Sequence, residues 1–578
     1  MDLRRDRVVQ AVAGLTILAL VLRLARLGHR VAHFDEGRVA YWIVEYRETG
    51  VLFYRPIIHG PLLHLANAPL FGLLGPTDFA MRLLPALVGG LLPLSALLFR
   101  HRLREETVVS LALLLALNPA LLYYSRFMRG DVIAGGCSFF AFACLVRAVD
   151  FDDGRYLYAA TVSLAVGLGA KENVLVYLLT FLGATALLLH HRLLFARSTD
   201  RTPVAVLISY LRWAARGVRR HATAIAGSVA AFLATFVLMY APRGSLPSQR
   251  LYYVACREPY EPHFDVSAAP TLGEAIANPL RIRDLVTFTL GSTAELYFCQ
   301  WIVPRTSDPN PYVEFLGALS LATVDSSTTL VLLAVAGFLG TLYAGDRPDD
   351  LASFGFYWGA ASLLGYPFVT DIGGAGWLVV HVVFPLTLPA AVALGVLAHV
   401  GREARVDRDH VSLALVGALV VVLVGSMAGT AYATSDANPQ SPDNPLVQYA
   451  QPAGDLKPTI HDMYALAEDN EGTDVVLYGE HLYNPVDEEL VRRPTCSNWF
   501  NGLPLPWYVA AGDVSADCAK NAPMLDEALE DDPPVIVAHA DERGPVDERV
   551  DGRYDARVHR MRATDTPFVF YVDESRLE

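Results

Sequence analysis

Long uninterrupted runs of apolar residues constrain this chain more than any other feature of its sequence. Of its 578 residues, 53% are hydrophobic, and the mean hydropathy is +0.33. Several runs are long enough to cross a bilayer, which takes about 20 residues in a helix. A single water-soluble core is therefore excluded, and the sequence predicts an all-α polytopic membrane protein.

The apolar runs predict about 11 transmembrane helices. The first run lacks a small-residue cleavage site, which favours an uncleaved helix over a signal peptide. The predicted helices lie near residues 10–28, 82–100, 107–123, 132–149, 157–170, 174–191, 222–241, 326–344, 351–369, 378–399 and 411–431. An odd number of crossings places the two termini on opposite sides of the membrane.

Arginines gather in three loops that this count assigns to the cytoplasm, namely 100–104, 190–221 and 401–408. The positive-inside rule therefore places the N-terminus in the cytoplasm and the C-terminal residues outside. Loop 345–350 is acidic and is the exception. The predicted outer loops are 29–81, 124–131 and 242–325, together with the turn at Lys171 and Glu172, and they share one membrane interface.

Residues 432–578 are predicted to form a soluble extracellular domain after the transmembrane domain 1–431. They hold 29 acidic and 11 basic residues, and only three of the 46 basic residues of the whole chain are lysines. An acidic, lysine-poor surface suits concentrated salt and indicates a halophilic archaeon. A GC-rich genome would also favour arginine over lysine, but it does not explain the excess of acidic residues in this domain. Strand-like runs such as 473–479 and 534–538, with helix-like segments between them, predict a small α/β domain.

The six cysteines fall in three pairs along the chain. Cys137 and Cys144 lie in an apolar segment, where a buried thiol is the ordinary interpretation. The other two pairs, Cys256 with Cys299 and Cys496 with Cys518, lie in segments predicted to be outside the cell. A disulfide in each of these pairs is left open.

Carboxylates, a histidine and aromatic residues gather in the first outer loop. Asp35 and Glu36 come first, and His59 follows after an aromatic stretch that includes Tyr41-Trp42. A carboxylate here can take a proton from a hydroxyl, whereas histidine and arginine can hold a phosphate or a metal that bridges to it. The alternative is a solvated interfacial loop whose charged residues have no role beyond keeping the loop hydrated.

Two further polar stretches carry charge next to apolar helices. Arg126, Arg129 and Asp131 lie in the second outer turn, where Asp131 can serve as a cap that accepts hydrogen bonds from the first amides of the next helix. Lys171 and Glu172 interrupt an otherwise apolar run, which is unfavourable at membrane depth unless the pair lines a cavity or is paired internally. Lys171 is predicted to bind phosphate.

The order of these motifs resembles the GT-C superfamily of lipid-phosphate-sugar-dependent glycosyltransferases, including protein O-mannosyltransferases and aminoarabinose transferases. The resemblance rests on Asp35-Glu36, Tyr41-Trp42, His59-Gly-Pro-Leu62, Gly75 and Arg82-Leu-Leu-Pro-Ala86, with Gly60 where the superfamily often has proline. Over its length the chain is also similar to the haloarchaeal flippase-activity-associated membrane proteins linked to N-glycosylation. That similarity rests on Tyr54-Arg-Pro-Ile-Ile-His-Gly-Pro61, Tyr123-Tyr-Ser-Arg-Phe-Met-Arg129, Lys171-Glu-Asn173 and Asn444-Pro-Leu-Val-Gln-Tyr-Ala-Gln-Pro-Ala-Gly454.

The resemblance implies an inverting hexosyltransferase that takes a sugar from a dolichyl (polyprenyl) phosphate. Asp35 would be the general base, and Glu36 would orient it or bind a metal. The remaining candidates are His59, Arg126, Arg129 and Lys171 for the donor phosphate, Asp131 and Glu172 as second carboxylates or metal ligands, and His263 and His381 as metal ligands. The implied cofactor is a divalent metal ion.

The expected partners are the donor lipid, a glycan, lipid-linked or protein acceptor, and membrane lipids, with no nucleic acid. The alternative is a non-catalytic flippase, or a flippase accessory, for lipid-linked glycans. A transporter is expected to show internal repeats with interrupted helices at the midplane, and the sequence shows neither.

Overall fold

The chain folds into two compact units, each assembled from three separate stretches of sequence. The computed structural model describes residues 6–196, 202–254, 256, 261–302, 311–343, 349–370, 372, 375–484, 496–550, 552–562 and 567–577. The helical unit comprises Met1–Ala25, Pro85–Met239 and Thr306–Pro439. The mixed unit comprises Arg26–Leu84, Tyr240–Arg305 and Gln440–Glu578.

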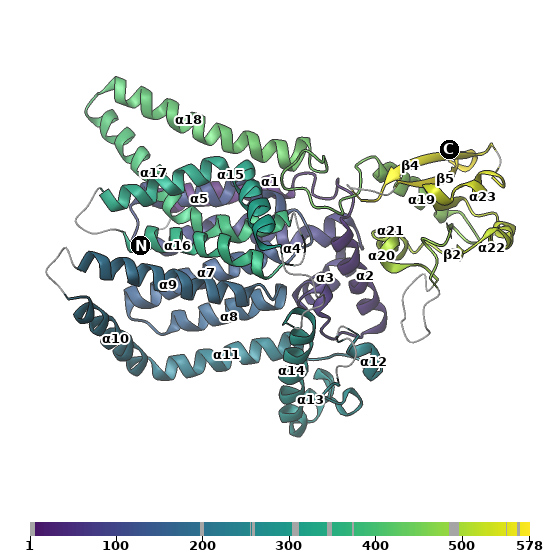
Figure 1. Cartoon of the computed structure of the whole chain (residues 1–578), viewed down its shortest axis with the longest axis horizontal. Coiled ribbons are helices and arrows are strands. Elements are labelled where there is room, and N and C mark those ends of the chain that lie inside the picture. Colours follow the sequence, from purple (N-terminus) through teal and green to yellow (C-terminus); the bar gives the residue numbers. More distant parts are fainter. Residues whose placement is uncertain are drawn as a thin grey trace. The chain divides into compact units, whose positions relative to one another are not determined.

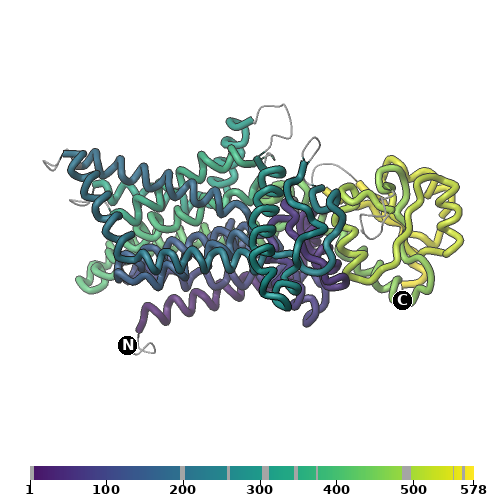
Figure 2. Tube along the Cα trace, turned by 90° about the horizontal axis from the view of Figure 1, so that it is seen from below, coloured from purple at the N-terminus to yellow at the C-terminus, as the bar shows by residue number. Residues whose placement is uncertain are grey.

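The helical unit is a bundle whose long helices run alongside one another (Figures 1 and 2). Helix α4 (Asp78–Leu91) begins in the mixed unit and leads into the 3₁₀ segment Leu92–Phe99 of the bundle. The other helices of the bundle are α1 (Arg7–Leu24), α5 (Glu105–Leu117), α6 (Pro119–Ser125), α7 (Asp131–Phe151), α8 (Arg155–Ala170), α9 (Val174–Ala196), α10 (Pro203–Arg220), α11 (Ala222–Tyr240), α15 (Tyr312–Tyr343), α16 (Asp350–Gly365), α17 (Val379–Val406) and α18 (His410–Tyr432).

The prediction of a multi-pass, all-α membrane protein is confirmed. In the described part of the chain, eight helices are long and apolar enough to cross a membrane, or nine if the bent pair α5 and α6 is one span. Every predicted transmembrane segment is helical, but α8 and α16 have only 16 residues each, fewer than the about 20 that span a bilayer. The number of eleven crossings therefore stays a prediction.

Helix α15 begins at Tyr312, whereas the sequence placed its start near residue 326, inside an expected outer loop. The helix is bent at Ser327, whose backbone angles of φ −138° and ψ 32° are not helical. Glu314 and Asp325 bring charge into the segment before this bend. A break with acidic residues on its N-terminal side resembles a loop, which is why the sequence did not reveal the earlier start.

The core of the helical unit is built around α17, which is the most deeply buried of the long apolar helices. About 83% of the residues in the most apolar stretch of Gly376–Val406 are buried. Helices α5, α15, α16 and α18 pack against α17. Gly337 of α15 lies against the backbone of α17, where a Cβ atom would clash with the carbonyl oxygen of Pro389. Small residues at such crossings let membrane helices approach closely.

The mixed unit combines short helices with one β-sheet. Its helices are α2 (Phe34–Thr49), α3 (Leu62–Leu74), α12 (Gln249–Tyr252), α13 (Leu272–Ala277), α14 (Ile282–Tyr297), α19 (Leu456–Glu468), α20 (Trp499–Gly502), α21 (Leu505–Ala511), α22 (Ala522–Ala528) and α23 (Gly544–Asp547). Both cysteine pairs that the sequence left open, Cys256 with Cys299 and Cys496 with Cys518, form disulfides in this unit.

The last stretch of the mixed unit, residues 440–578, is called the tail below. Its described residues form a five-stranded sheet in the order β2-β1-β3-β5-β4. Strand β1 runs parallel to β2 and β3, whereas β5 runs antiparallel to β3 and β4. The strands are β1 (Val475–Tyr478), β2 (Ala516–Ala519), β3 (Val535–His539), β4 (Tyr554–Arg560) and β5 (Pro567–Asp573). The predicted small α/β domain is therefore confirmed.

The tail packs on the first loop within the mixed unit, and Asp78 at the start of α4 holds the two together. Its carboxylate accepts hydrogen bonds from Trp507 Nε1 (3.1 Å) and Tyr508 Oη (3.0 Å), and it is ion-paired with Lys457. Gly37 of α2 also lies close to the tail, since a Cβ atom there would be 2.8 Å from Pro504 Cβ. The tail is therefore an integral part of the unit that carries α2.

Candidate functional site

The start of α2 is fixed by a reciprocal cap between His33 and Glu36. His33 Nδ1 accepts a hydrogen bond from the Asp35 amide (3.0 Å), and the Glu36 carboxylate accepts one from the His33 amide (2.9 Å). This capping box satisfies amide groups that the first turn of a helix leaves without partners. It sets the direction in which the following side chains leave the helix.

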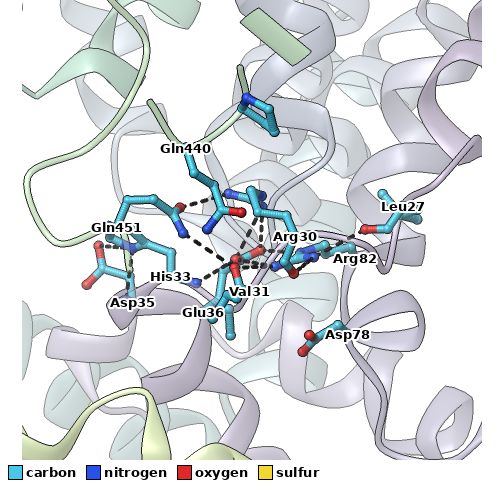
Figure 3. Close-up of polar contacts among 12 residues, drawn as sticks. Leu27, Arg30, Val31, His33, Asp35, Glu36, Asp78, Arg82, Gln440 and Gln451 are labelled. Carbon is cyan, nitrogen blue, oxygen red and sulfur yellow. Dashed lines mark hydrogen bonds and ion pairs between the residues drawn. The ribbon is translucent and has the colours of Figure 1, made fainter. Parts of the chain in front are cut away.

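Glu36 is a buried anchor that two arginines hold in place (Figure 3). Arg82 donates from Nε and Nη2 to the two carboxylate oxygens at 2.8 Å each, and Arg30 contacts the same oxygens at 3.3 Å. The Glu36 side chain is fully buried. Burial opposes its ionisation, but the charges of Arg30 and Arg82 outweigh burial and lower the Glu36 pKa from 4.5 to about 2.

The same two arginines tie the loop before α2 to the rest of the mixed unit. Arg82 also donates to three main-chain carbonyls, those of Leu27 (3.2 Å), Arg30 (2.8 Å) and Val31 (3.2 Å). Arg30 donates to Gln451 Oε1 (3.1 Å) in the tail. Glu36 therefore supports a network rather than standing as an accessible acid.

Asp35 has a different environment from its neighbour. Its side chain is 16% exposed and forms an ion pair with Arg38, one turn further along α2, at 2.8 Å. Of the two adjacent acids, Asp35 is thus the partly exposed one, whereas Glu36 is buried and positions the turn that carries Asp35.

A second polar cluster lies in the helical unit around Asp131, the first residue of α7. The Asp131 side chain is fully buried and contacts Lys171 Nζ at 2.7 Å and Arg129 Nε at 3.1 Å. Both cations also lie over the ring of Trp377, with Arg129 4.3 Å and Lys171 5.8 Å from its centre. Asp131 and Trp377 thereby hold an ammonium and a guanidinium group in fixed positions inside the bundle.

His381 of α17 completes this cluster from a distant part of the sequence. Its Nε2 lies 3.2 Å from Asp131 Oδ1, and its Nδ1 lies 2.8 Å from Tyr177 Oη. Tyr366 stacks on the imidazole with a centroid distance of 4.4 Å. These contacts fix the histidine ring against the carboxylate.

The local backbone explains how Lys171 reaches Asp131. Helix α8 ends at Ala170 and α9 begins at Val174, so Lys171 lies in an extended linker with φ −162° and ψ 139°. Gly130 lies against this linker, where a Cβ atom would clash with the Ala170 carbonyl and lie 3.0 Å from Lys171 Cβ. Glycine before Asp131 is therefore what allows the second turn and the linker to approach each other.

Two further predicted residues of the helical unit, Arg126 and Glu172, lie near these turns in sequence. Arg126 is ion-paired with Asp436 (2.8 Å) and donates to the carbonyl of Ala25 (2.9 Å). Glu172 is buried in the linker after Lys171. The capping alternative for Asp131 is not observed, because the described contacts of its carboxylate are with side chains.

The two remaining predicted residues belong to the mixed unit. His59 stacks on Trp301 with a centroid distance of 6.0 Å, and it adopts a left-handed backbone with φ 66°. A positive φ is unfavourable for a residue other than glycine, so this conformation is imposed by its surroundings. His263 is bonded to Glu295 through Nδ1 (2.7 Å), and Glu295 also accepts from Tyr253 Oη (2.8 Å).

The residues proposed as metal ligands do not form a ligand set in the described structure. Within the described residues, no group of three or more His, Cys, Asp or Glu side chains is arranged to hold a metal ion. Asp131 instead contacts two cations and a histidine, and His263 contacts Glu295. The metal ion therefore stays a prediction, and no chemical step below depends on it.

Sequence reasoning did not single out several residues that build these clusters. Arg82 belongs to a motif of the first loop, but no sequence feature points to Arg30, Tyr177, Tyr366 or Trp377. The spacing of His33 and Glu36, three residues apart before a helix, is a capping-box signal that could have identified the anchor. No comparable local signal connects Trp377 to Arg129.

The arrangement of the helices defines the class: the chain is a multi-pass membrane protein with a GT-C fold. The crystal structure of ArnT from Cupriavidus metallidurans bound to undecaprenyl phosphate matches with a TM-score of 0.52 and 14% identity, over 97% of each chain. The Pmt1-Pmt2 complex of S. cerevisiae, bound to its sugar donor, covers 40% of this chain and 34% of that chain with 19% identity and a TM-score of 0.30.

Two family models match separate parts of the sequence. Residues 58–213 match the model for dolichyl-phosphate-mannose-protein mannosyltransferase, and residues 456–573 match the C-terminal domain of Agl23 flippase-associated protein. Both resemblances that the sequence motifs indicated are therefore confirmed. A search of curated proteins finds none that matches the chain.

Proposed function

We propose that this chain is an inverting glycosyltransferase that uses a dolichyl (polyprenyl) phosphate hexose as donor, in cell-surface protein N-glycosylation or a related glycan pathway. The GT-C fold is that of polyprenyl-phosphate-dependent glycosyltransferases. The observation that carries the proposal is the buried pair of cations, Lys171 and Arg129, held by Asp131. Such cations suit the phosphate of a lipid donor.

The proposed reaction is a single displacement. Asp35 accepts the proton of the acceptor hydroxyl while the hydroxyl oxygen attacks the anomeric carbon. The bond from that carbon to the donor phosphate breaks, and the lipid phosphate leaves with the electron pair. Lys171 and Arg129 neutralise the charge that develops on the phosphate, and Asp131 with His381 keeps them in position.

A second candidate function is favoured by the match of residues 456–573 to a flippase-associated domain. In that case the chain would bind lipid-linked glycans and assist their translocation without transferring a sugar. To separate the candidates, the purified protein is reconstituted in lipid vesicles with labelled dolichyl phosphate hexoses and lipid-linked or glycoprotein acceptors. Transfer of label supports the enzyme. Translocation without transfer for every donor and acceptor pair supports the second candidate.

Lys171→Ala is expected to weaken binding of dolichyl phosphate by roughly 10–100-fold, because a hydrogen bond to a charged group contributes about 1.5–3 kcal/mol. Binding is measured by titrating the purified protein with the lipid. Lys171→Arg is the matched control, since it keeps the positive charge and should retain more of the affinity. Unchanged affinity in Lys171→Ala would remove Lys171 from the phosphate site.

We also propose that the C-terminal domain lies outside the cell and the N-terminus in the cytoplasm. Ser441→Cys, near the start of the mixed unit's tail segment, is then expected to react with a membrane-impermeant thiol reagent in intact cells. The protein with its native cysteines alone is the control for background labelling. Labelling that appears only after lysis would contradict this topology.

A further inference from the structure

Helix α10 is the one helix of the bundle in which no residue is buried in the described structure. It occupies residues Pro203–Arg220, within the predicted cytoplasmic loop that is rich in arginine. It connects α9 to α11, two helices that are long and apolar enough to cross a membrane, at the end of the bundle where α11 begins (Figure 1). Neither the fold nor the proposed reaction uses it.

The residues of α10 separate into two faces. At 3.6 residues per turn, its four arginines fall within an arc of roughly 100°. This arginine face comprises Arg212, Arg216, Arg219 and Arg220, with Ser209 among them. The apolar face on the other side comprises Leu207, Tyr210, Leu211, Ala214 and Val218. The helix contains no acidic residue, so its charge is uniformly positive.

Among the described residues, most of the apolar face stays uncovered. Leu211 is 61% exposed and Val218 is 58% exposed, and every residue from Ile208 to Arg220 is exposed, whereas Leu207 is partly buried. Such a face on a helix that follows one membrane span and leads into the next cannot stay in water without a large loss of hydrophobic stabilisation. The four arginines within 18 residues, in turn, make α10 too charged to cross a bilayer itself.

The C-terminal end of α10 is fixed close to a membrane span. Only His221 separates Arg220 from α11, which begins at Ala222. Arg220 is ion-paired with Asp152, the residue after α7, and His221 Nε2 lies 2.7 Å from the same carboxylate. By contrast, Arg212, Arg216 and Arg219 have no ion pair among the described residues. Three arginines are therefore available for an anionic partner at the level where α11 enters the membrane.

We propose that α10 lies in the plane of the membrane interface and binds the headgroups of anionic phospholipids. Its apolar face enters the boundary of the acyl chains, while Arg212, Arg216 and Arg219 contact the lipid phosphates. A basic helix with opposed apolar and arginine faces binds membranes in this way, and its binding depends on the negative charge of the surface. The position of α10 next to a membrane span favours lipid over a soluble protein partner.

The test places a fluorophore on each face of α10 in the full-length protein. In a background with Cys137→Ala and Cys144→Ala, Leu211→Cys marks the apolar face and Ser209→Cys is the matched control on the arginine face. Each variant is labelled with the environment-sensitive dye NBD and reconstituted in vesicles of phosphatidylcholine, with or without phosphatidylglycerol. Emission wavelength and quenching by nitroxide-labelled lipid or by aqueous acrylamide report where each face lies.

With phosphatidylglycerol, the dye at position 211 is expected to emit at shorter wavelength and to be quenched by nitroxide lipid. The dye at position 209 is expected to be quenched by acrylamide. In the triple variant Arg212→Gln/Arg216→Gln/Arg219→Gln, the difference between the two kinds of vesicle should be lost. The triple lysine variant keeps the charge and should retain that difference, which separates charge recognition from misfolding.

Two results would overturn the proposal. If acrylamide quenches the dye equally at positions 211 and 209 in both kinds of vesicle, the apolar face is in water and is free for a soluble partner. If position 211 enters lipid equally well without phosphatidylglycerol, or in the glutamine variant, the arginines do not recognise anionic headgroups.

Discussion

Asp35→Asn is expected to lower glycosyl transfer by roughly 10²–10⁴-fold while binding of the donor lipid changes little. Asparagine keeps the size of the side chain and accepts hydrogen bonds, but it cannot take up the proton of an acceptor hydroxyl. The contact between Asp35 and Arg38 loses its charge pairing, which makes folding a necessary control. The rate is measured with labelled donor, and folding by size exclusion in detergent. Unchanged transfer would remove Asp35 from the reaction.

A double variant shows whether Asp35 and Lys171 act on the same bond. If they do, Asp35→Asn with Lys171→Ala should be little slower than the slower single variant, because residues that act as a unit are not additive. A non-catalytic carrier has no proton to transfer. In that case Asp35→Asn would be nearly silent, and Lys171→Ala alone would reduce lipid translocation. Measuring transfer and translocation for all three variants distinguishes these outcomes.

Glu36→Gln is expected to destabilise the mixed unit by about 3–5 kcal/mol, because it leaves Arg30 and Arg82 buried without their counter-charge. Glutamine has nearly the same shape, so a change in packing does not account for the loss. Thermal unfolding in detergent measures the effect. Glu527→Gln, at an exposed position on α22 of the same unit, is the control and should stay within about 0.5 kcal/mol of the unsubstituted protein. A similarly small effect at Glu36 would mean that the ion pairs contribute little.

The stability difference between the unsubstituted protein and Glu36→Gln is also expected to depend on pH. Because folding lowers the Glu36 pKa from 4.5 to about 2, the charged form contributes stability that is fully present above about pH 4.5. That contribution is lost as the pH falls through about 2. The difference in stability between the unsubstituted protein and Glu36→Gln should therefore shrink over this range. A difference that is independent of pH would point to packing rather than charge.

The helical architecture was largely predictable from sequence because the signal is local. Apolar runs mark every helix that was expected, from α1 to α18, and strand-like runs mark β1 and β3. The predicted start of α15 was too late in the sequence because acidic residues precede the bend at Ser327. Which stretches of the chain belong to the same unit was not predictable. Residues 26–84 and 440–578, for example, are brought together by tertiary packing, and no local sequence pattern encodes that packing.

Some residues of the two clusters were predictable from the sequence, but their contacts were not. Lys171 and Asp131 are 40 positions apart, and His381 lies 250 positions from Asp131. The sequence indicated each of them separately because a charge beside an apolar run is conspicuous. The sequence predicts Asp35 as the base and Glu36 as a residue that orients it or binds a metal, and the structure adds that Asp35 is partly exposed whereas Glu36 is buried between two arginines.

The way the mixed unit is assembled has a consequence for synthesis of the protein. The contact of Arg30 with Gln451 joins residues 421 positions apart, and Asp78 meets Tyr508 across 430. The ribosome therefore releases the loop that carries Asp35 long before its tail partners exist. Until the last helices are inserted and the tail has emerged, this loop lacks the contacts that the tail supplies. Maturation of the α2 region is thus expected to be a late, post-translational event, and a chain truncated before Gln451 would be inserted but not completed.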